Sequence, residues 1–87
     1  MKKKTKIYVS CFNIDFIYVS KLRKWIDIED LFGTNYTASN MKGFNTLDKA
    51  WKSVLQLYKL GAKDILLWRE ITTKSGRYAI EYDVDLT

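Results

Sequence analysis

Few side chains in this sequence could carry out chemistry, and the first group to consider is acidic. Glu81, Asp83 and Asp85 alternate near the C-terminus, so on a β-strand their carboxylates would share one face. Three carboxylates at that spacing could hold a hard cation such as magnesium. A charged strand that discourages edge-to-edge aggregation has the same pattern and is much more common. The acids within residues 27–30 fit no known metal loop. We therefore expect no metal site.

The other residues on which enzymes depend are largely missing. The 87 residues include no histidine, which removes catalytic triads, most zinc sites and imidazole proton shuttles. The lone cysteine, Cys11, falls in an apolar strand pattern that is typical of an inert core thiol. The four glycines form neither G-x-x-x-x-G-K nor G-x-G-x-x-G. These absences predict a non-catalytic protein that uses no cofactor.

A row of lysines is the more specific polar feature. Lys49, Lys52 and Lys59 recur at helical spacing, and Lys63 continues the row. Such a row could follow phosphate groups or dock in an acidic protein groove, although an ordinary exposed helix face also carries lysines. The net charge of +5 favours anionic partners. Residues 1–5 add a basic start that we expect to be flexible.

Aromatic side chains define a second candidate surface. If their strands form one sheet, the face away from a covering helix displays Tyr8, Phe12, Phe16, Tyr18 and Trp68. That is more aromatic surface than a small monomer usually exposes. It could stack the bases of single-stranded nucleic acid, bind a protein, form a homodimer, or be covered by residues 27–43. The glycine-aromatic signature of the RNA-recognition sheet is missing.

The first of the elements that would position these side chains contains a short internal repeat. In IYVSCFNIDFIYVS the letters IYVS occur twice, ten residues apart. A β-hairpin with a loop at residues 13–15 would place Cys11 opposite Ile17 and Val9 opposite Val19. This register sorts the aliphatic and aromatic side chains onto opposite faces. The alternative is a helix that starts near the loop, with apolar residues at helical spacing through residue 32.

The middle of the chain predicts a short helical turn, a loop and one long helix. The turn begins at Asp27 and stops at Gly33, and residues 34–45 are polar and small enough for a mobile loop. The long helix follows Asn45 as its cap and stops at Gly61. Its apolar stripe comprises Leu47, Ala50, Trp51, Val54, Leu57 and Tyr58.

A second hairpin, turning at residues 73–76, completes the fold. Its pattern predicts a buried face with the pairs Ile71/Tyr78, Arg69/Ile80, Leu67/Tyr82 and Ile65/Val84, and an opposite face with Trp68/Glu81 and Leu66/Asp83. The order of elements predicts a single α+β domain over residues 1–87. In this two-layer domain, one main helix covers one face of an antiparallel sheet of about four strands.

The sequence also bears on location. No run of eighteen apolar residues occurs, and polar residues interrupt the segment after the basic start. We therefore expect neither a transmembrane helix nor a signal peptide, and no membrane partner. A single cysteine gives no sign of an oxidising compartment, so a cytoplasmic location is expected.

In general character, this compact, lysine- and isoleucine-rich, histidine-free chain is similar to the short accessory proteins of low-GC phages and mobile elements. The likeness covers no alignable residues. Many such proteins, anti-defence proteins among them, inhibit a larger protein stoichiometrically. We therefore expect an inhibitor or adaptor that binds a larger protein or ribonucleoprotein complex, with Trp68 and Tyr18 as anchors. The alternative is nucleic-acid binding through the lysines and the aromatic face.

Overall fold

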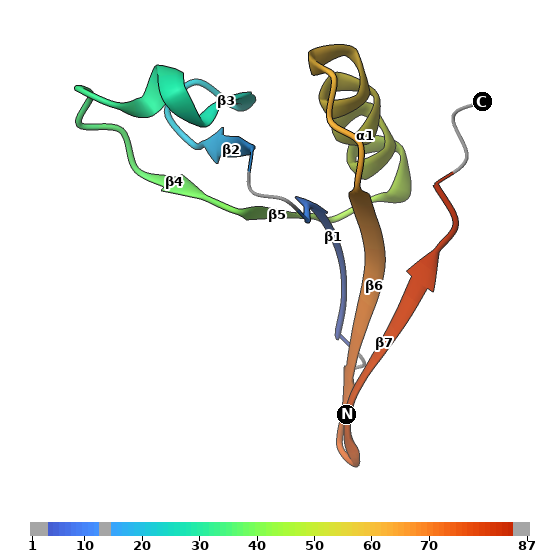
Figure 1. The fold of residues 1–87 in the computed structure, drawn as a ribbon. Helices are drawn as coiled ribbons and strands as arrows, with labels where there is room; N and C mark the ends of the chain where they lie inside the picture. The colour runs from blue at the N-terminus through green and yellow to red at the C-terminus, as the bar shows by residue number, and fades with distance from the viewer. Residues whose placement is uncertain (1–3, 13–14, 85–87) are drawn as a thin grey trace.

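The fold, described for residues 4–12 and 15–84 in a computed structural model, contains one long helix and two antiparallel sheets (Figure 1). The predicted α+β class is confirmed, with a second, smaller sheet in addition. The larger sheet has the strand order β5-β1-β6-β7 and the smaller β3-β2-β4. The elements are β1 Lys4–Cys11, β2 Phe16–Val19, β3 Lys24–Asp27, η1 Ile28–Leu31, β4 Ala38–Ser39, β5 Met41–Phe44, α1 Leu47–Leu60, β6 Ile65–Thr73 and β7 Gly76–Tyr82.

The hairpin predicted from the two IYVS segments is wrong, because β1 and β2 belong to different sheets. β1 lies between β5 and β6, with Ile7 opposite Phe44 on one side and Arg69 on the other. The alternation along β1 has the predicted sense, since Ile7, Val9 and Cys11 are buried. Alternation indicates which face of a strand is buried, but it does not identify the neighbouring strand.

The N-terminal residues are only partly described. Of the start that the sequence predicts to be flexible, residues 1–3 lie outside the described part of the chain. Lys4 and Thr5 belong to β1, whose register with β6 begins there.

β2 forms the centre of the smaller sheet, where it pairs with β3 and β4. All four of its residues are buried, so neither face of this strand is open. The chain reverses after β2 in a turn in which the N–H of Arg23 donates to the carbonyl of Val19 (2.8 Å). The alternative prediction of a helix is therefore also wrong, because residues 16–27 contain two strands.

The segment between β3 and α1 was predicted in part. The short helical turn is confirmed as η1, a 3-10 helix capped by Asp27, whose carboxylate accepts from the N–H of Glu29 (2.9 Å). The loop predicted at residues 34–45 is wrong, since this segment contributes β4 and β5. Both are edge strands, where polar and small residues are common, so their composition resembles that of a loop.

α1 forms where the local signals are strongest. Thr46 rather than Asn45 is the N-cap, and its hydroxyl accepts a backbone N–H from the first turn (3.3 Å). Gly61 ends the helix in the left-handed conformation (φ 98°), as predicted. The predicted apolar stripe is wrong at its first and last residues, because Leu47 and Tyr58 are 41% and 51% exposed. The buried side of the helix comprises Ala50, Ser53, Val54 and Leu57.

The hairpin of β6 and β7 has the predicted register, but its predicted buried face is wrong at Tyr78 and Ile80, which are exposed. Arg69 lies opposite Ile80 and Trp68 opposite Glu81, and the two strands are joined by a two-residue turn. β7 ends at Tyr82, so the two pairs predicted beyond that residue are not part of the ladder. The guanidinium of Arg69 lies 5.5 Å from the centroid of the Tyr82 ring, which accommodates this charge on the helix side of the sheet.

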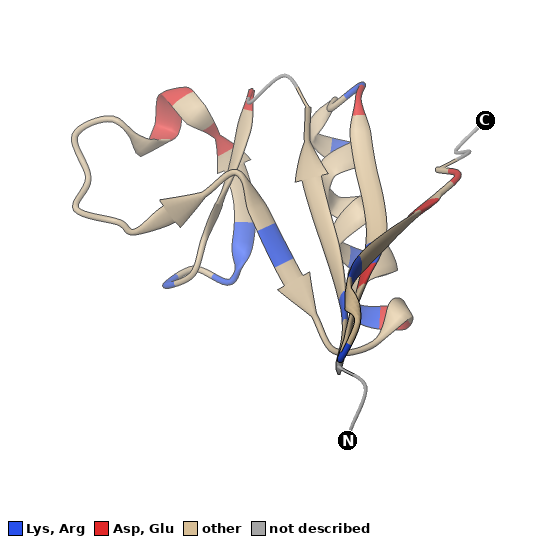
Figure 2. Cartoon of the chain, turned by 90° about the horizontal axis from the view of Figure 1, so that it is seen from below, with Lys and Arg blue, Asp and Glu red and all other residues tan. Residues whose placement is uncertain are grey.

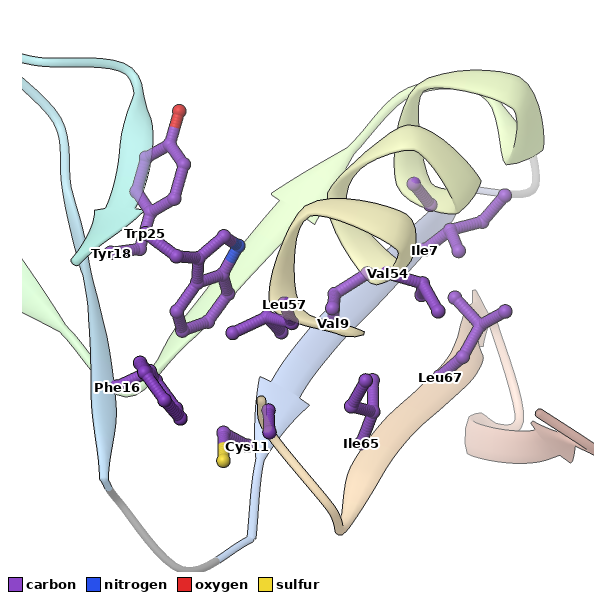
Figure 3. Packing of buried hydrophobic residues seen from close by; sticks show 12 residues of the cluster. Ile7, Val9, Cys11, Phe16, Tyr18, Trp25, Val54, Leu57, Ile65 and Leu67 are labelled. Carbon is purple, nitrogen blue, oxygen red and sulfur yellow. The ribbon is translucent and has the colours of Figure 1, made fainter. Parts of the chain in front are cut away.

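The core lies between α1 and the larger sheet and continues to the smaller sheet (Figure 3). Trp25 of β3 reaches the helix, where its indole N–H donates to the hydroxyl of Ser53. Cys11 is a buried free thiol, which confirms its expected place in the core. The core cluster also includes Ile7, Val9, Phe16, Val54, Leu57, Ile65 and Leu67.

Within the described residues, no helix is long and apolar enough to cross a membrane.

Candidate functional site

The first candidate site is the face of the larger sheet opposite α1, which we call the open face. Side chains alternate along each strand, and the helix packs against the side that carries Ile7, Val9 and Leu67. The opposite side therefore presents every second residue of the four strands. The described side chains of the open face are Lys6, Tyr8 and Ser10 of β1, Met41 and Gly43 of β5, Leu66, Trp68, Glu70 and Thr72 of β6, and Arg77, Ala79 and Glu81 of β7.

Two aromatic rings form the centre of the open face. Tyr8 and Trp68 are directly opposite each other on β1 and β6. Their ring centroids are 5.5 Å apart and the ring planes differ by 21°, which is a stacked arrangement. Both side chains are partly exposed. The sequence predicted both residues for this surface, but not their pairing.

Gly43 gives the rings room on the β5 side. It lies opposite Tyr8, and a Cβ atom at this position would be 3.0 Å from Cε1 of Tyr8 and 2.6 Å from Cε of Lys6. Any larger residue would displace one of these side chains. The glycine therefore allows Tyr8 and Lys6 to lie across β5. This role was not predicted, because Gly43 falls in the segment predicted as a loop.

Shallow hollows border the tryptophan on two sides. One, of about 390 Å³, is lined by Leu66, Trp68, Ala79 and Glu81. A second, of about 210 Å³, includes Trp68, Leu66, Ser10, Cys11, Asn40, Met41 and Phe12. Phe12 is 66% exposed and lines this second hollow with Trp68, so this predicted aromatic residue lies beside the open face. Two shallow, mainly apolar recesses thus adjoin the stacked pair.

Charged side chains of both signs lie on the open face. Lys6 lies opposite Glu70, and Arg77 and Glu81 are four residues apart on the same face of β7. The described side chains of this face in the paired strands therefore carry two basic and two acidic groups.

Two residues predicted for the aromatic face lie elsewhere, and their placement on it was wrong. Phe16 and Tyr18 are 9% and 8% exposed and belong to the core. Tyr18 packs edge-to-face against Trp25, with ring centroids 5.5 Å apart (Figure 3). The physical reason is that β2 is not a neighbour of β1, so its aromatic side chains pack towards α1 and β3 instead.

A second candidate site is a cleft between α1 and the smaller sheet, with a volume of about 330 Å³. Lys49 and Lys52 line it from the helix, as part of the predicted basic stripe, and Arg23 lines it from the turn after β2. Lys42 of β5 lies beside it, with Nζ 5.1 Å from the centroid of the Tyr18 ring. We call these four cations and the space between them the basic cleft. Its remaining lining residues are Tyr18, Phe44, Ser53 and Gln56.

Sequence reasoning identified half of this cluster. Lys59 and Lys63 are exposed but do not line the cleft, so the predicted stripe divides after its first two lysines. Arg23 and Lys42 were missed, because they approach the helix only through the pairing of strands distant in sequence. Figure 2 shows basic segments in the turn before β3 and in β5, while the acids of η1 lie at the other end of β3.

The predicted acidic groups form no site among the described residues. No cluster of three metal-ligating side chains occurs in residues 4–12 and 15–84. Asp27 serves as the cap of η1, where a negative charge is favourable. Asp85, the last member of the row that includes Glu81 and Asp83, lies outside the described residues.

Comparison of the chain with family models, with curated proteins and with solved structures finds no match. The two candidate surfaces are therefore interpreted from their own chemistry.

Proposed function

We propose that this protein is a non-catalytic binding protein whose open face docks on a larger protein or protein–nucleic-acid complex. On this proposal it acts stoichiometrically, as an inhibitor or adaptor of the anti-defence type found among phage accessory proteins. Tyr8 and Trp68 are the anchors. The observation that carries the proposal is the stacked, partly exposed Tyr8–Trp68 pair on the open face.

The surroundings of this pair support a protein partner. Interfaces concentrate their binding energy in a few central aromatic residues that are enclosed by less important contacts. Trp68 sits between two hollows that could receive partner side chains, and charged residues such as Lys6 and Glu81 lie at the margin. An apolar centre with a polar rim is the usual arrangement of such interfaces.

The test is capture of the partner by variants of the two anchors. Wild-type protein immobilised on beads should retain a protein from lysate after nuclease treatment, and Tyr8→Ala and Trp68→Ala should each lose it. Truncation of an anchor should weaken binding by about 30-fold or more. Tyr58→Ala is the matched control, because it removes a 51% exposed aromatic ring from α1, away from the open face. Equal capture by the folded anchor variants and the control would refute the proposal.

Nucleic-acid binding is the second candidate, and the basic cleft is the observation that favours it. Four cations surround one cleft, and none of them forms an ion pair with a carboxylate within the described chain. Phosphate groups bound there would release counterions, so affinity would fall steeply with salt. Lys49→Gln/Lys52→Gln should reduce the slope of log affinity against log salt concentration by the equivalent of about two phosphate contacts. The affinity is measured by fluorescence anisotropy with labelled single-stranded RNA.

The same charge change outside the cleft provides the control. Lys59→Gln/Lys63→Gln removes two lysines of the same helical stripe that do not line the cleft, so its salt dependence should stay close to wild type. If both double variants behave alike, only the net charge matters. If binding does not respond to salt, the nucleic-acid proposal fails.

A further inference from the structure

The outer edge of β7 is unpaired in the described chain, because β7 is the last strand of the larger sheet. The turn that joins it to β6 closes at the pair Thr73 and Gly76, and hydrogen-bonded pairs then alternate along the hairpin. The even-numbered residues of β7 therefore direct their backbone groups towards β6. Residues 77, 79 and 81 direct theirs outwards, where they can bind another strand.

Two large apolar side chains lie beside this edge. Tyr78 and Ile80 are 53% and 50% exposed on the helix side of β7. α1 does not cover them, because the helix packs over β1, β5 and β6 while β7 diverges from it (Figure 1). An edge strand with free backbone groups and exposed apolar side chains favours association with a further strand.

The sequence of β7 is complementary to itself in one antiparallel register. If two copies pair with Ala79 opposite Ala79, Arg77 of each copy lies opposite Glu81 of the other. On the other face, each Tyr78 lies opposite an Ile80. We propose that this protein forms a symmetric dimer through β7, in which the two four-stranded sheets join into one continuous sheet.

Neighbouring registers satisfy the charges less well. The outward backbone groups restrict antiparallel self-pairing to shifts of two residues. One such shift places Arg77 opposite Ala79, and the shift in the other direction places Glu81 opposite Ala79. Only the register centred on Ala79 pairs both charged residues of β7 with an opposite charge. Opposite charges across a strand pair are favourable and like charges are unfavourable, so the charges select this register.

The dimer would have a defined geometry. A two-fold axis through the paired strands, perpendicular to the sheet, keeps the same face of both copies on the same side. Both helices then lie on one side of the joined sheet, and both Tyr8–Trp68 pairs lie on the other. The dimer itself does not depend on the proposed function. If that proposal also holds, the dimer presents two docking faces to one partner assembly.

The first measurement is the mass in solution, by light scattering after size exclusion. Wild type should have twice the 10.3 kDa mass of one chain. Arg77→Glu and Glu81→Arg should each be monomeric, because each places like charges opposite each other. An equimolar mixture of the two variants should recover the dimer, since every charged pair is then complementary. Lys74→Glu, a charge reversal in the exposed turn, is the matched control and should remain dimeric.

A backbone variant tests the edge independently of charge. Ala79→Pro removes an N–H that points away from β6, so the hairpin should stay folded while the dimer is lost, with an unchanged circular dichroism spectrum as the control for folding. A wild type that remains monomeric up to about 1 mM would overturn the proposal. So would charge variants that stay dimeric, or a mixture of the two variants that stays monomeric.

Discussion

Trp25 is the residue whose removal should cost the fold most. It is the largest of the fully buried side chains, with 1% of its surface exposed, and it connects the smaller sheet to α1. Its indole N–H donates to the hydroxyl of Ser53, and its backbone N–H donates to the side chain of Gln56 (3.3 Å). The ring also packs edge-to-face against Tyr18. The change to test is therefore Trp25→Ala, followed by smaller changes of the same contact.

The expected magnitude follows from burial and from the lost hydrogen bond. Truncation of a buried tryptophan to alanine costs about 3–5 kcal/mol. At about 0.05–0.15 kcal/mol per residue, an 87-residue domain has a total stability of about 4–13 kcal/mol, so this variant approaches unfolding. Ser53→Ala leaves the indole N–H buried without its partner and should cost about 1–3 kcal/mol. Trp25→Phe leaves the Ser53 hydroxyl unpaired instead.

The assay is urea unfolding followed by far-UV circular dichroism, on wild type, Trp25→Ala, Ser53→Ala, Trp25→Phe and the double variant Trp25→Phe/Ser53→Ala. The double variant should lose about 1 kcal/mol less than the sum of the two single changes, because neither polar group is then left unpaired. A loss below about 1 kcal/mol for Trp25→Ala, or strictly additive single changes, would refute the role of Trp25 in joining the sheet to the helix.

Three further changes test local features of the fold. Gly43→Val should displace the side chains of Lys6 and Tyr8, and therefore reduce partner capture with only a small change in the urea midpoint. Gly61→Ala should lower the free energy of unfolding by about 1 kcal/mol, because φ is 98° at this C-terminal cap; an unchanged midpoint would contradict that cost. Thr46→Ala should cost about 1 kcal/mol by removing the N-cap acceptor of α1, whereas Thr46→Ser should retain most of the stability.

The C-terminal half of the fold was predictable because its determinants are local. α1 is defined by signals within its own segment, namely the C-terminal cap at Gly61 and apolar residues that recur every three or four positions. The register of β6 and β7 follows from the two-residue turn that joins them. This turn fixes every pair along the two strands, from Ile71 opposite Tyr78 to Leu67 opposite Tyr82. Even here the exposed positions of Leu47 and Tyr58 were missed, since they depend on how far the sheet extends beneath the helix.

The N-terminal half was mispredicted because its pairing is long-range. Ile7 contacts strands that begin 34 and 58 residues later, at Met41 and Ile65. A local pattern of alternating residues is equally consistent with a hairpin, so the sequence favoured the nearer partner. The candidate site was predicted only in part for the same reason. Tyr8 and Trp68 were both proposed, but the pairing that stacks them, and the glycine opposite Tyr8, depend on these distant strands.

The arrangement of the strands also bears on which partner the chain selects. An RNA-binding sheet needs aromatic rings and phosphate-binding cations on one surface, so that a base and its own phosphate are held together. Here the stacked rings lie on the open face, and the basic cleft lies on the other side of the sheet, against α1. A single strand of nucleic acid would have to pass around an edge of the sheet to use both. This separation favours a protein partner for the rings and leaves the cleft as an independent anion site. Trp68→Ala should therefore affect only protein capture, and Lys49→Gln/Lys52→Gln only the salt-dependent binding of nucleic acid.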